Sequence, residues 1–316
     1  MTTQSRIDIL LGTYNGERFV ERQIESILDQ MDDRCRLLVR DDGSTDRTVL
    51  MVRQFARQHP RQIRLLNDAG PRLGPCGNFG RLLEHSDADY VVLCDQDDVW
   101  RPGRIALPLE RLQAIERRLG VDTPALVHTD LVVVDENLRT IAPSFWAYSR
   151  ISPRHGGHLN RLLVQNVVTG CATMINRSLA RLASPIPANV QMHDWWLALV
   201  AAAFGRVEAI PQATVLYRQH DNNQLGAVRY DWRYVLRRAK EMFRCGDMMR
   251  RFHETQRQAA AFGDRFAASL PQRDEATVAA YLKLDRAGFL NRRMQLLRHG
   301  FLKTGWLRNL GWLIVI

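Results

Sequence analysis

Short apolar runs alternate with amphipathic stretches through the first hundred residues of the chain. Each run is four to six residues long, the length of a strand, and most are followed by polar residues and then by apolar residues at helical spacing. Strands and helices in regular alternation are typical of βαβ units in a parallel sheet. We expect strands at Ile7–Gly12, Arg36–Arg40, Ile63–Leu66 and Tyr90–Cys94, and helices after Gly16, from about Asp46 to His59, and at Asn78–Glu84.

The second part of the chain has a more mixed pattern. Further strands are expected at Ala125–Val134, Thr169–Ile175, Arg206–Ile210 and Ala213–Tyr217, with a helix at about Trp195–Phe204. Beyond Gln224 the apolar spacing becomes helical, and Pro271 forms an internal boundary. We therefore predict a large α/β domain over residues 1–224 and a helical region over residues 225–316.

The run Tyr90–Cys94 leads directly into a loop with three carboxylates in four positions. Because the run lacks polar alternation, it is typical of a strand buried on both faces of a parallel sheet. Such sheets bind ligands beyond the carboxyl ends of their strands. Asp95, Asp97 and Asp98 repel one another unless a divalent cation neutralises them. The stretch predicts a metal site that holds a phosphate.

Two more polar loops follow predicted strands at the same edge. Thr13-Tyr14-Asn15 comes after the first strand, and Asp41-Asp42-Gly43-Ser44-Thr45-Asp46 comes after the second. We expect both loops to converge with the acidic loop on one crevice. There the Asp42 carboxylate is able to accept the N–H of a uracil or thymine ring, whereas Asp46 is expected to cap the next helix.

The acidic loop also fits other kinds of site. A calcium loop is excluded, because the sixth position from Asp95 is Trp100 rather than Gly and the twelfth is Ala106 rather than Glu. The local sequence Asp-x-Asp-x-Val also matches the motif of phosphatases that form an aspartyl-phosphate. That motif normally opens its sheet, however, and here two strands with polar loops precede it.

Composition and charge limit the possible binding partners and cellular location of the protein. With 316 residues and 46% apolar residues the chain can build a large core, and its net charge of +10 is concentrated in arginines beyond Arg229. We predict no nucleic-acid partner. Five scattered cysteines without a Cys-x-x-Cys pair favour a reducing, cytoplasmic setting. We expect neither a signal peptide nor a spanning helix, so the protein is expected to be soluble or peripheral at the inner face of the cytoplasmic membrane.

Two more motifs occur later in the chain, His193-Asp194-Trp195-Trp196 and Tyr217-Arg218-Gln219-His220. Together with the three polar loops, these motifs resemble the family-2 glycosyltransferases with a GT-A fold. The resemblance covers about residues 5 to 222, and its variants are similar to bacterial rhamnosyltransferase-like enzymes of surface-polysaccharide assembly. It implies a mostly parallel central sheet flanked by helices, with a helical C-terminal appendage. The residues that carry it are Thr13-Tyr14-Asn15, Asp41 to Asp46, Asp95-Gln96-Asp97-Asp98-Val99-Trp100, His193-Asp194-Trp195-Trp196 and Tyr217-Arg218-Gln219-His220.

The resemblance also implies roles at the donor site. Thr13 and Asp42 match positions that hold the nucleoside, and Asp97 matches the main ligand of Mn²⁺ or Mg²⁺. His220 is either a further ligand or a surface histidine, and Arg218 is a candidate to neutralise the diphosphate. The nucleotide-sugar candidates are Thr13, Tyr14, Asn15, Asp41, Asp42, Asn78, Asp95, Gln96 and Arg218, and the metal candidates are Asp95, Asp97, Asp98 and His220.

Asp194 is the candidate general base. An ionised carboxylate takes the proton of an acceptor hydroxyl as that oxygen attacks the anomeric carbon, so one base and one metal suffice for inversion. The alternative is a helix N-cap, a position that also favours Asp. Trp195 and Trp196 either form the floor of an acceptor site or belong to the core.

The C-terminal segment 300–316 combines tryptophans with basic residues. Leu302, Trp306, Leu310 and Leu313 fall on one helical face, which suits an interfacial helix on anionic lipid. The alternatives are a helix docked on its own domain and a homodimer contact.

These expectations combine into one function. We predict an inverting, metal-dependent glycosyltransferase that uses a dTDP- or UDP-sugar, with rhamnose as the first candidate sugar. The acceptor is a bacterial polysaccharide or lipid-linked oligosaccharide, and loops around Trp146, Asn166 and Trp195 set specificity. The rivals are a phosphatase-type hydrolase built on Asp95 and Asp97 and a non-enzymatic basic binding module.

Overall fold

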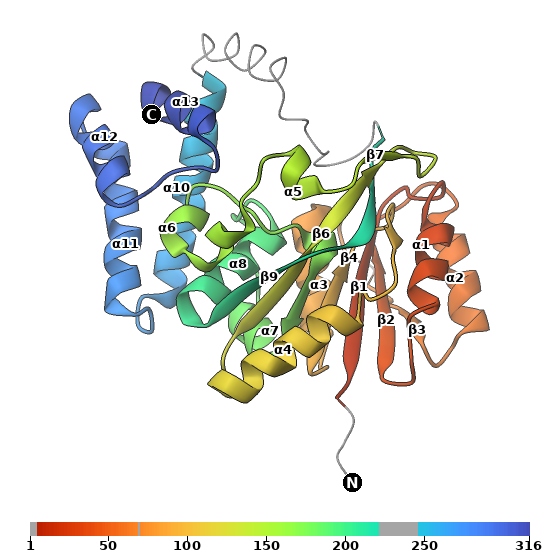
Figure 1. Cartoon of the computed structure of the whole chain (residues 1–316). Helices are drawn as coiled ribbons and strands as arrows, with labels where there is room; N and C mark the ends of the chain where they lie inside the picture. The colour runs from red at the N-terminus through yellow and green to blue at the C-terminus, as the bar shows by residue number, and fades with distance from the viewer. Residues whose placement is uncertain (1–4, 69, 221–245) are drawn as a thin grey trace.

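The structure, a computed structural model, describes residues 5–68, 70–220 and 246–316 (Figure 1). The predicted domain boundary at residue 224 lies outside these residues, as do Arg229, Arg233, Arg237, Arg238 and Arg244 of the predicted basic region.

The first half of the sheet is parallel, as the alternation of strands and helices predicted. Strands β1 (Ile7–Thr13), β2 (Cys35–Asp41), β3 (Ile63–Leu65) and β4 (Tyr90–Cys94) pair in parallel, in the spatial order β3-β2-β1-β4. The register aligns Thr13 with Asp41, so the two strands end at the same level. The carboxyl ends of these strands therefore form one edge, as the alternation predicted.

The second half of the sheet is mixed. Strand β8 (Thr173–Asn176) runs antiparallel to β4 and to β6 (Ala125–Val134), while β9 (Arg206–Arg218) is parallel to β6. Short strands β5 (Val99–Trp100) and β7 (Thr140–Ala142) add antiparallel pairs to β9 and β6. Four strand pairings in the described residues are thus parallel and four are antiparallel, so the expected mostly parallel sheet is a mixed one.

Two predicted strands in this half need correction. The stretches at 206–210 and 213–217 form the single strand β9, because Thr129 pairs with Ile210 and Asp130 with Ala213, which leaves Pro211 and Gln212 as a bulge. The predicted strand from Thr169 is a turn of 3-10 helix (Gly170–Ala172) before β8 begins.

Helices cover both faces of the sheet (Figure 1). One apolar core includes Ile9 and Leu11 of β1 together with α1 (Val20–Leu28), α2 (Thr48–Gln58) and α4 (Ala106–Leu119). The other includes Leu10 of β1 together with α3 (Gly74–Glu84), α7 (Arg177–Ala183) and α8 (His193–Phe204). Alternate side chains of one buried strand thus enter two different cores.

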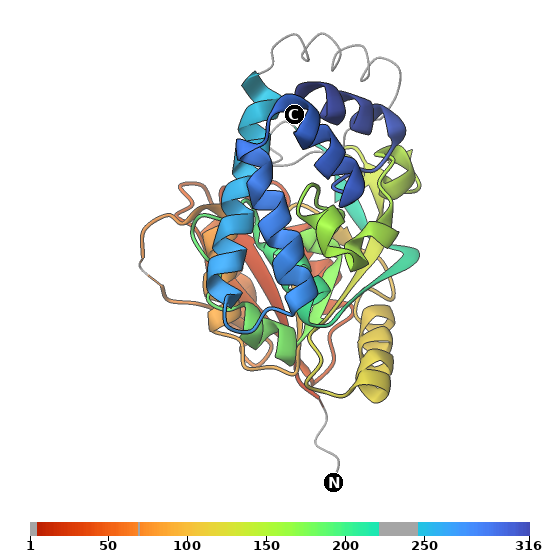
Figure 2. The same ribbon diagram turned by 90° about the vertical axis from the view of Figure 1, so that its left-hand side faces the viewer.

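The C-terminal helices pack against the second of these cores (Figure 2). They are α10 (Gly246–Phe266), α11 (Gln272–Leu282), α12 (Phe289–Arg298) and α13 (Trp306–Val315), with a 3-10 turn at Lys283–Arg286. Pro271 immediately precedes α11, at the predicted boundary. The rings of Phe262 and Phe266 contact the indole of Trp196 in α8.

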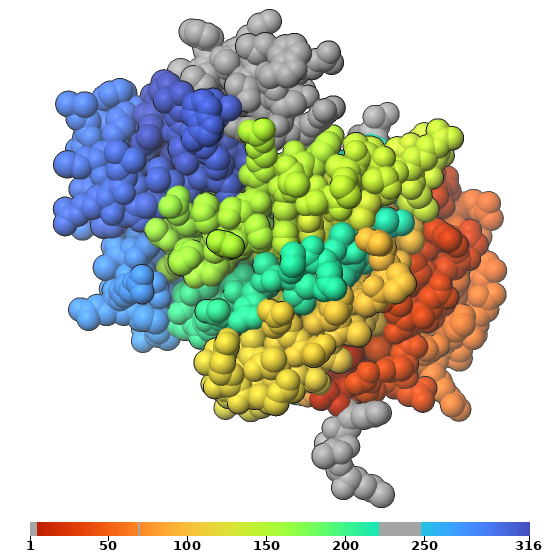
Figure 3. Space-filling view, in the orientation of Figure 1, coloured from red at the N-terminus to blue at the C-terminus, as the bar shows by residue number. Residues whose placement is uncertain are grey.

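The helical region also contacts the segment before β8 (Figure 3). That segment holds α5 (Phe145–Tyr148), a 3-10 turn (Pro153–Gly157) and α6 (Leu159–Leu162). The side chains of Asn160 and Arg161 donate to the carbonyls of His299 and Leu302, and Arg308 donates to the carbonyl of Ser149. Among the described residues, no helix is long and apolar enough to cross a membrane.

Candidate active site

The first two polar loops are bound to each other at the carboxyl edge. The Thr13 hydroxyl donates to Asp41 Oδ1 at 2.8 Å, and Asp41 Oδ2 accepts from the backbone of Gly43 and Ser44. Asn15 has a positive φ of 46° and accepts from the backbone of Thr45. The two loops converge as predicted. Their side-chain oxygens, however, mostly accept hydrogen bonds from residues of the loops themselves.

The acidic loop joins them through Gln96. Its side-chain amide accepts from the backbone N–H of Tyr14 at 2.8 Å and donates to the carbonyl of the same residue at 2.9 Å. The Tyr14 ring lies under the guanidinium of Arg72, 3.7 Å from its centroid. Gln96 therefore aligns the loop after β4 with the loop after β1.

Asp42 is buried at the tip of β2. Its Oδ1 accepts from Leu73 N at 2.8 Å and Arg40 Nη1 at 3.0 Å, and its Oδ2 accepts from Gly74 N at 2.8 Å. Gly74 has a φ of +70°, a conformation that favours glycine. The carboxylate thus fastens the start of α3 to the edge of the sheet. Asp46 accepts from the backbone of Thr48, the first residue of α2, as its capping role predicted.

Arg40 is a buried residue that the sequence analysis did not select. Its Nη1 donates to Asn78 Oδ1 at 3.0 Å, and Asn78 Nδ2 donates back to the Arg40 carbonyl at 3.1 Å. Both ends of the Asn78 amide are therefore engaged beneath the loop. The only signal was an arginine at the end of an otherwise apolar strand.

The carboxylates after β4 lie close together. Burial, followed by the charges of Asp97 and Asp194, raises the pKa of Asp95 to about 7. Asp98 is fully buried; burial and the charges of Asp97 and Asp95 raise its pKa well above the ordinary value. Asp98 Oδ1 accepts from Arg218 N at 3.1 Å, while Oδ2 has no hydrogen-bond partner within the described part of the chain.

The predicted metal ligands form two adjoining groups. The Asp95 and Asp98 carboxylates share a cluster with the Cys171 thiol in which the ligand atoms all lie within 4.8 Å of one another. Asp97 Oδ2 lies 2.9 Å from His220 Nε2. Sequence reasoning missed Cys171, which burial keeps protonated by raising its pKa well above the ordinary value.

These residues fit Mn²⁺ or Mg²⁺. Carboxylate oxygens are the ligands that both ions prefer, and an imidazole nitrogen also suits Mn²⁺. A cation would relieve the repulsion that raises the pKa of Asp95 and would give the unpartnered Asp98 Oδ2 a partner. A protonated thiol is a poor ligand for either ion, so Cys171 is left out of the proposed set.

Arg218 supports the acidic loop from β9. Its Nε donates to the Asp97 carbonyl at 2.7 Å and its Nη1 to the Glu136 carbonyl, with the guanidinium 4.6 Å from the Phe19 ring centroid. These contacts are to backbone and to an aromatic ring, so they position Asp97. The predicted role of Arg218 in neutralising a diphosphate stays a prediction.

Asp194 lies in the first turn of α8 and is almost fully buried. Its Oδ2 accepts from Gly170 N at 3.0 Å and its Oδ1 from Trp195 N at 2.6 Å. Burial raises its pKa to about 6. A Cβ on Gly170 would lie 3.0 Å from Nε2 of the neighbouring His193, so the close approach at this position requires glycine.

His193, beside the candidate base, is itself neutral. It is buried and stacks on Phe79 with ring centroids 4.0 Å apart, and burial lowers its pKa to about 3. It therefore packs the start of α8 against α3. The motif His193-Asp194 supplies one ionisable carboxylate rather than a histidine base.

The two tryptophans have different environments. Trp196 is fully buried, donates from Nε1 to the Ala183 carbonyl at 2.9 Å and packs on Phe262 and Phe266. Its predicted acceptor role is therefore wrong, and its core alternative holds. Trp195 is partly exposed and donates from Nε1 to the Leu162 carbonyl, so it remains a candidate acceptor residue.

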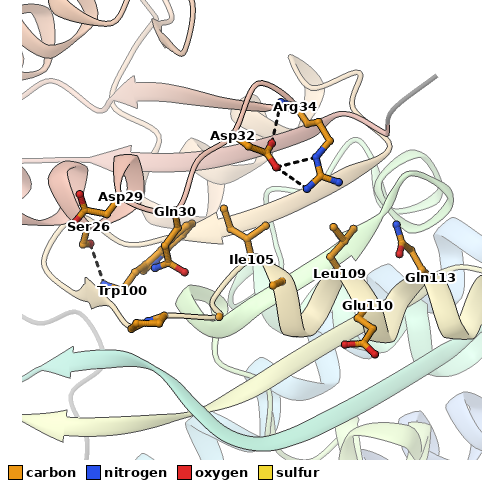
Figure 4. A pocket seen from close by; sticks show the side chains of 13 residues that line it. Ser26, Asp29, Gln30, Asp32, Arg34, Trp100, Ile105, Leu109, Glu110 and Gln113 are labelled. Atoms are coloured by element: carbon orange, nitrogen blue, oxygen red, sulfur yellow. Dashed lines mark hydrogen bonds and ion pairs between the residues drawn. The ribbon is translucent and has the colours of Figure 1, made fainter. Parts of the chain in front are cut away.

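A hollow of about 520 Å³ lies away from these loops, between the end of α1 and the start of α4 (Figure 4). It is lined by residues such as Asp29, Asp32, Trp100, Leu109 and Glu110. None of the predicted site residues lines it, so we assign the site to the loops and not to this hollow.

Comparison with known proteins connects the geometry with a family. Residues 8–181 match the family model described as glycosyl transferase family 2, which is more than half of the chain. The dTDP-rhamnosyl transferase RfbG of Shigella flexneri is 28% identical over 228 residues, covering 69% of this chain and 74% of that protein.

Two solved structures share the fold. The mannosyltransferase PcManGT from Pyrobaculum calidifontis in complex with GDP-Man and Mn²⁺ is 18% identical with a TM-score of 0.50, covering 95% of this chain and 85% of that one. TarS 1-349 of S. aureus in complex with UDP-GlcNAc is 13% identical with a TM-score of 0.53, covering 94% of this chain and 87% of that one.

Proposed function

The chain belongs to glycosyl transferase family 2 and has the GT-A fold, and we propose that it is an inverting, metal-dependent member. The proposed reaction moves a sugar from a nucleoside-diphosphate donor to a bacterial polysaccharide or lipid-linked oligosaccharide. Family membership removes both rivals considered from the sequence, the phosphatase-type hydrolase and the non-enzymatic binding module.

One observation carries the mechanistic part of the proposal. Asp194 Oδ2, from the start of α8, accepts from Gly170 N at 3.0 Å, and the thiol of the next residue, Cys171, lies within 4.8 Å of the ligand atoms of Asp95 and Asp98 after β4. A base and a metal-binding carboxylate from segments about a hundred residues apart thus meet at one edge of the sheet. That arrangement serves a single displacement, in which the acceptor attacks as the diphosphate leaves.

Asp194 has the properties of a general base. With a pKa of about 6 it is mostly ionised at pH 7, yet it is a better proton acceptor than an ordinary aspartate. The N–H groups of Gly170 and Trp195 each bind one of its oxygens and orient it. In the proposed step the carboxylate takes the acceptor's hydroxyl proton, the new glycosidic bond forms, and the bond to the diphosphate oxygen breaks.

Asp95, Asp97, Asp98 and His220 are the proposed metal ligands. When bound, Mn²⁺ or Mg²⁺ supplies Lewis-acid stabilisation of the departing diphosphate. Arg218 contributes by holding the Asp97 backbone. The Mn²⁺ in the mannosyltransferase of similar fold supports this choice of ion.

The donor is proposed to be a dTDP- or UDP-sugar. A carboxylate has about four acceptor positions, and Asp42 uses three of them, for Leu73, Gly74 and Arg40. Arg72 Nε also lies 3.9 Å from Asp42 Oδ2. We propose that the remaining position accepts the ring N–H of uracil or thymine, with Thr13 nearby, since its carbonyl accepts from Asp42 N at 2.8 Å. The relative named as a dTDP-rhamnosyl transferase supports dTDP-rhamnose as the first candidate.

Nucleotide binding tests this proposal. In the presence of Mn²⁺, UDP and dTDP are expected to raise the melting temperature of the full chain, because a ligand that binds only the folded state stabilises it. GDP, whose base is a larger purine, serves as the control. A response to GDP alone would contradict the role of Asp42, and no response to any of the three would contradict the donor site.

A further inference from the structure

The last two helices expose an unusual share of the apolar surface. Seven of the twelve large apolar side chains that are exposed in the described residues lie in α12 and α13, with exposed fractions from 50% to 79%. We call this surface the α12/α13 face. Its residues are Phe289, Leu290, Met294, Leu297, Trp306, Leu310 and Ile314.

These side chains form one stripe on each helix. Leu290, Met294 and Leu297 are spaced at i, i+4 and i+7, and Trp306, Leu310 and Ile314 at i, i+4 and i+8. The opposite sides of the helices are buried, through residues such as Leu296 and Trp312. Each helix thus packs against the protein with its buried side, and its stripe is a second apolar surface that faces outward.

The two helices are held side by side (Figures 1 and 2). Arg292 Nη1 donates to the Ile316 carbonyl at 2.7 Å, and Arg293 Nη2 donates to the Ile314 carbonyl at 2.9 Å. Both bonds run from α12 to the end of α13. The two stripes therefore belong to a common, braced surface.

The charge of this part of the chain is one-sided. From residue 286 to the end the sequence has six basic residues and no Asp or Glu: Arg286, Arg292, Arg293, Arg298, Lys303 and Arg308. The Arg293 guanidinium lies 3.2 Å from the centroid of the exposed Phe289 ring, so positive charge and apolar surface adjoin within the α12/α13 face. A basic and apolar surface is complementary to the headgroup region of an anionic membrane.

A second copy of the chain fits this surface less well. A two-fold dimer would place the α12/α13 face against itself. Basic side chains beside the face, such as Arg293, would then oppose their own copies, and residues 286–316 contain no carboxylate side chain to compensate. An anionic lipid layer removes that repulsion and accepts the apolar side chains. Charge complementarity therefore selects the membrane among the possible occupants.

We propose that the α12/α13 face docks in the plane of an anionic membrane surface, with Leu290, Phe289 and Trp306 among the side chains that enter the headgroup region. The inference rests on the proposed function in one respect, because it gives the enzyme access to a lipid-linked acceptor. It names the surface that makes the contact. No membrane-spanning element is required.

Vesicle flotation with the full chain tests this inference. The wild type is expected to float with phosphatidylcholine vesicles that contain about one-third phosphatidylglycerol, and to float weakly with pure phosphatidylcholine or at high salt. The test variant combines Leu290→Glu with Trp306→Glu. The matched control combines Leu50→Glu with Val121→Glu, which replaces two apolar residues that are also highly exposed, at 59% and 70%, with the same change of charge.

The test variant is expected to lose vesicle binding by about tenfold or more, because membrane partitioning depends on buried apolar area and on charge together. The control variant is expected to change it by less than about twofold. Equal flotation of the two variants, or no flotation of the wild type, would overturn the inference. It would also be overturned if light scattering showed a wild-type dimer that the test variant converts to monomer.

Turnover measured on the same samples separates this inference from the proposed function. Transfer to a soluble saccharide acceptor should be unchanged in the test variant, since neither residue lies in the candidate active site. Transfer without flotation would refute the docking surface and leave the function standing. Flotation that depends on the α12/α13 face without any turnover of nucleotide sugars would support the surface while refuting the function.

Discussion

Asp194→Asn is expected to abolish most sugar transfer while leaving the protein at least as stable. The substitution keeps the shape of the side chain and removes its charge and basicity. Loss of a positioned general base typically costs about 10²–10⁴ in rate, so kcat should fall by at least about 100-fold. The donor KM should change little, because Asp194 is assigned to the acceptor hydroxyl.

The stability change can be worked from the burial of the carboxylate. Burial raises the pKa of Asp194 from 3.8 to about 6, which corresponds to roughly 3 kcal/mol of cost for holding the charge in the folded state. That cost is absent well below pH 4, where the carboxyl is protonated in both states. It grows as the pH rises from about 4 to about 6, because the carboxyl ionises first in the unfolded state, and it is fully present above pH 6. The Asn variant escapes this cost, but its single acceptor oxygen leaves the N–H of either Gly170 or Trp195 without its partner, which costs about 1–3 kcal/mol. Its free energy of unfolding at pH 7 should therefore equal that of the wild type or exceed it by up to about 2 kcal/mol.

Urea unfolding and steady-state turnover measured at pH 4, 5.5 and 7 check both halves of the prediction. Asp8→Asn is the matched control. Asp8 is also buried, but Arg36 binds both of its oxygens, at 2.9 and 2.8 Å. Asp8→Asn should lower the free energy of unfolding on the order of 1–3 kcal/mol, because it breaks an ion pair whose Arg36 partner is partly exposed to solvent. It should leave kcat unchanged.

Two results would refute the assignment of Asp194. If Asp194→Asn retained kcat, the base would have to be another group. If the variant were inactive and also unfolded at pH 7, the carboxylate would be a structural cap rather than a base held at a cost in stability.

Three further predictions concern the acidic loops and the core. Asp97→Asn should lower Mn²⁺-dependent turnover on the order of 100-fold, because metal stabilisation of the leaving group contributes several kcal/mol; an unchanged response to added Mn²⁺ after chelation would argue against Asp97 as a ligand. His220→Asn should raise the half-saturating Mn²⁺ concentration about tenfold or more, whereas the exposed His85→Asn should not; equal curves for the two variants would leave His220 as a partner of Asp97 that does not bind the metal. Trp196→Ala should destabilise the protein by about 3–5 kcal/mol and leave the acceptor KM of the folded fraction unchanged, as judged by unfolding and initial rates; a raised acceptor KM with normal stability would restore its acceptor role.

The pattern of apolar runs was sufficient for the first four strands and for the edge where the loops meet. Those strands are short, mainly apolar runs followed by polar residues, so both their position and the point where each strand ends were visible in the sequence. The antiparallel direction of β8 could not be predicted, because a strand of four buried residues carries no signal for strand direction. Helix α4 was not predicted either, although its buried Leu109, Leu112 and Ile115 recur every three residues, a spacing typical of one helix face.

Residues that act through tertiary contacts were the hardest to find. Arg40 and Cys171 carry no motif of their own, and only the folded chain brings Arg40 beside Asn78 and Cys171 beside Asp98. The choice between the two tryptophans likewise depends on the C-terminal helices, because α10 covers Trp196 and leaves Trp195 partly exposed. Sequence reasoning named both outcomes for this pair and could not separate them.

The central claim is tested most directly by turnover of a panel of nucleotide sugars with and without Mn²⁺, with both the transferred sugar and the released phosphate species measured. The account predicts Mn²⁺-dependent transfer from a dTDP- or UDP-sugar, with dTDP-rhamnose preferred, one nucleoside diphosphate released per sugar, and loss of both products in Asp194→Asn. Exclusive use of a guanosine donor, or release of inorganic phosphate without sugar transfer, would contradict it.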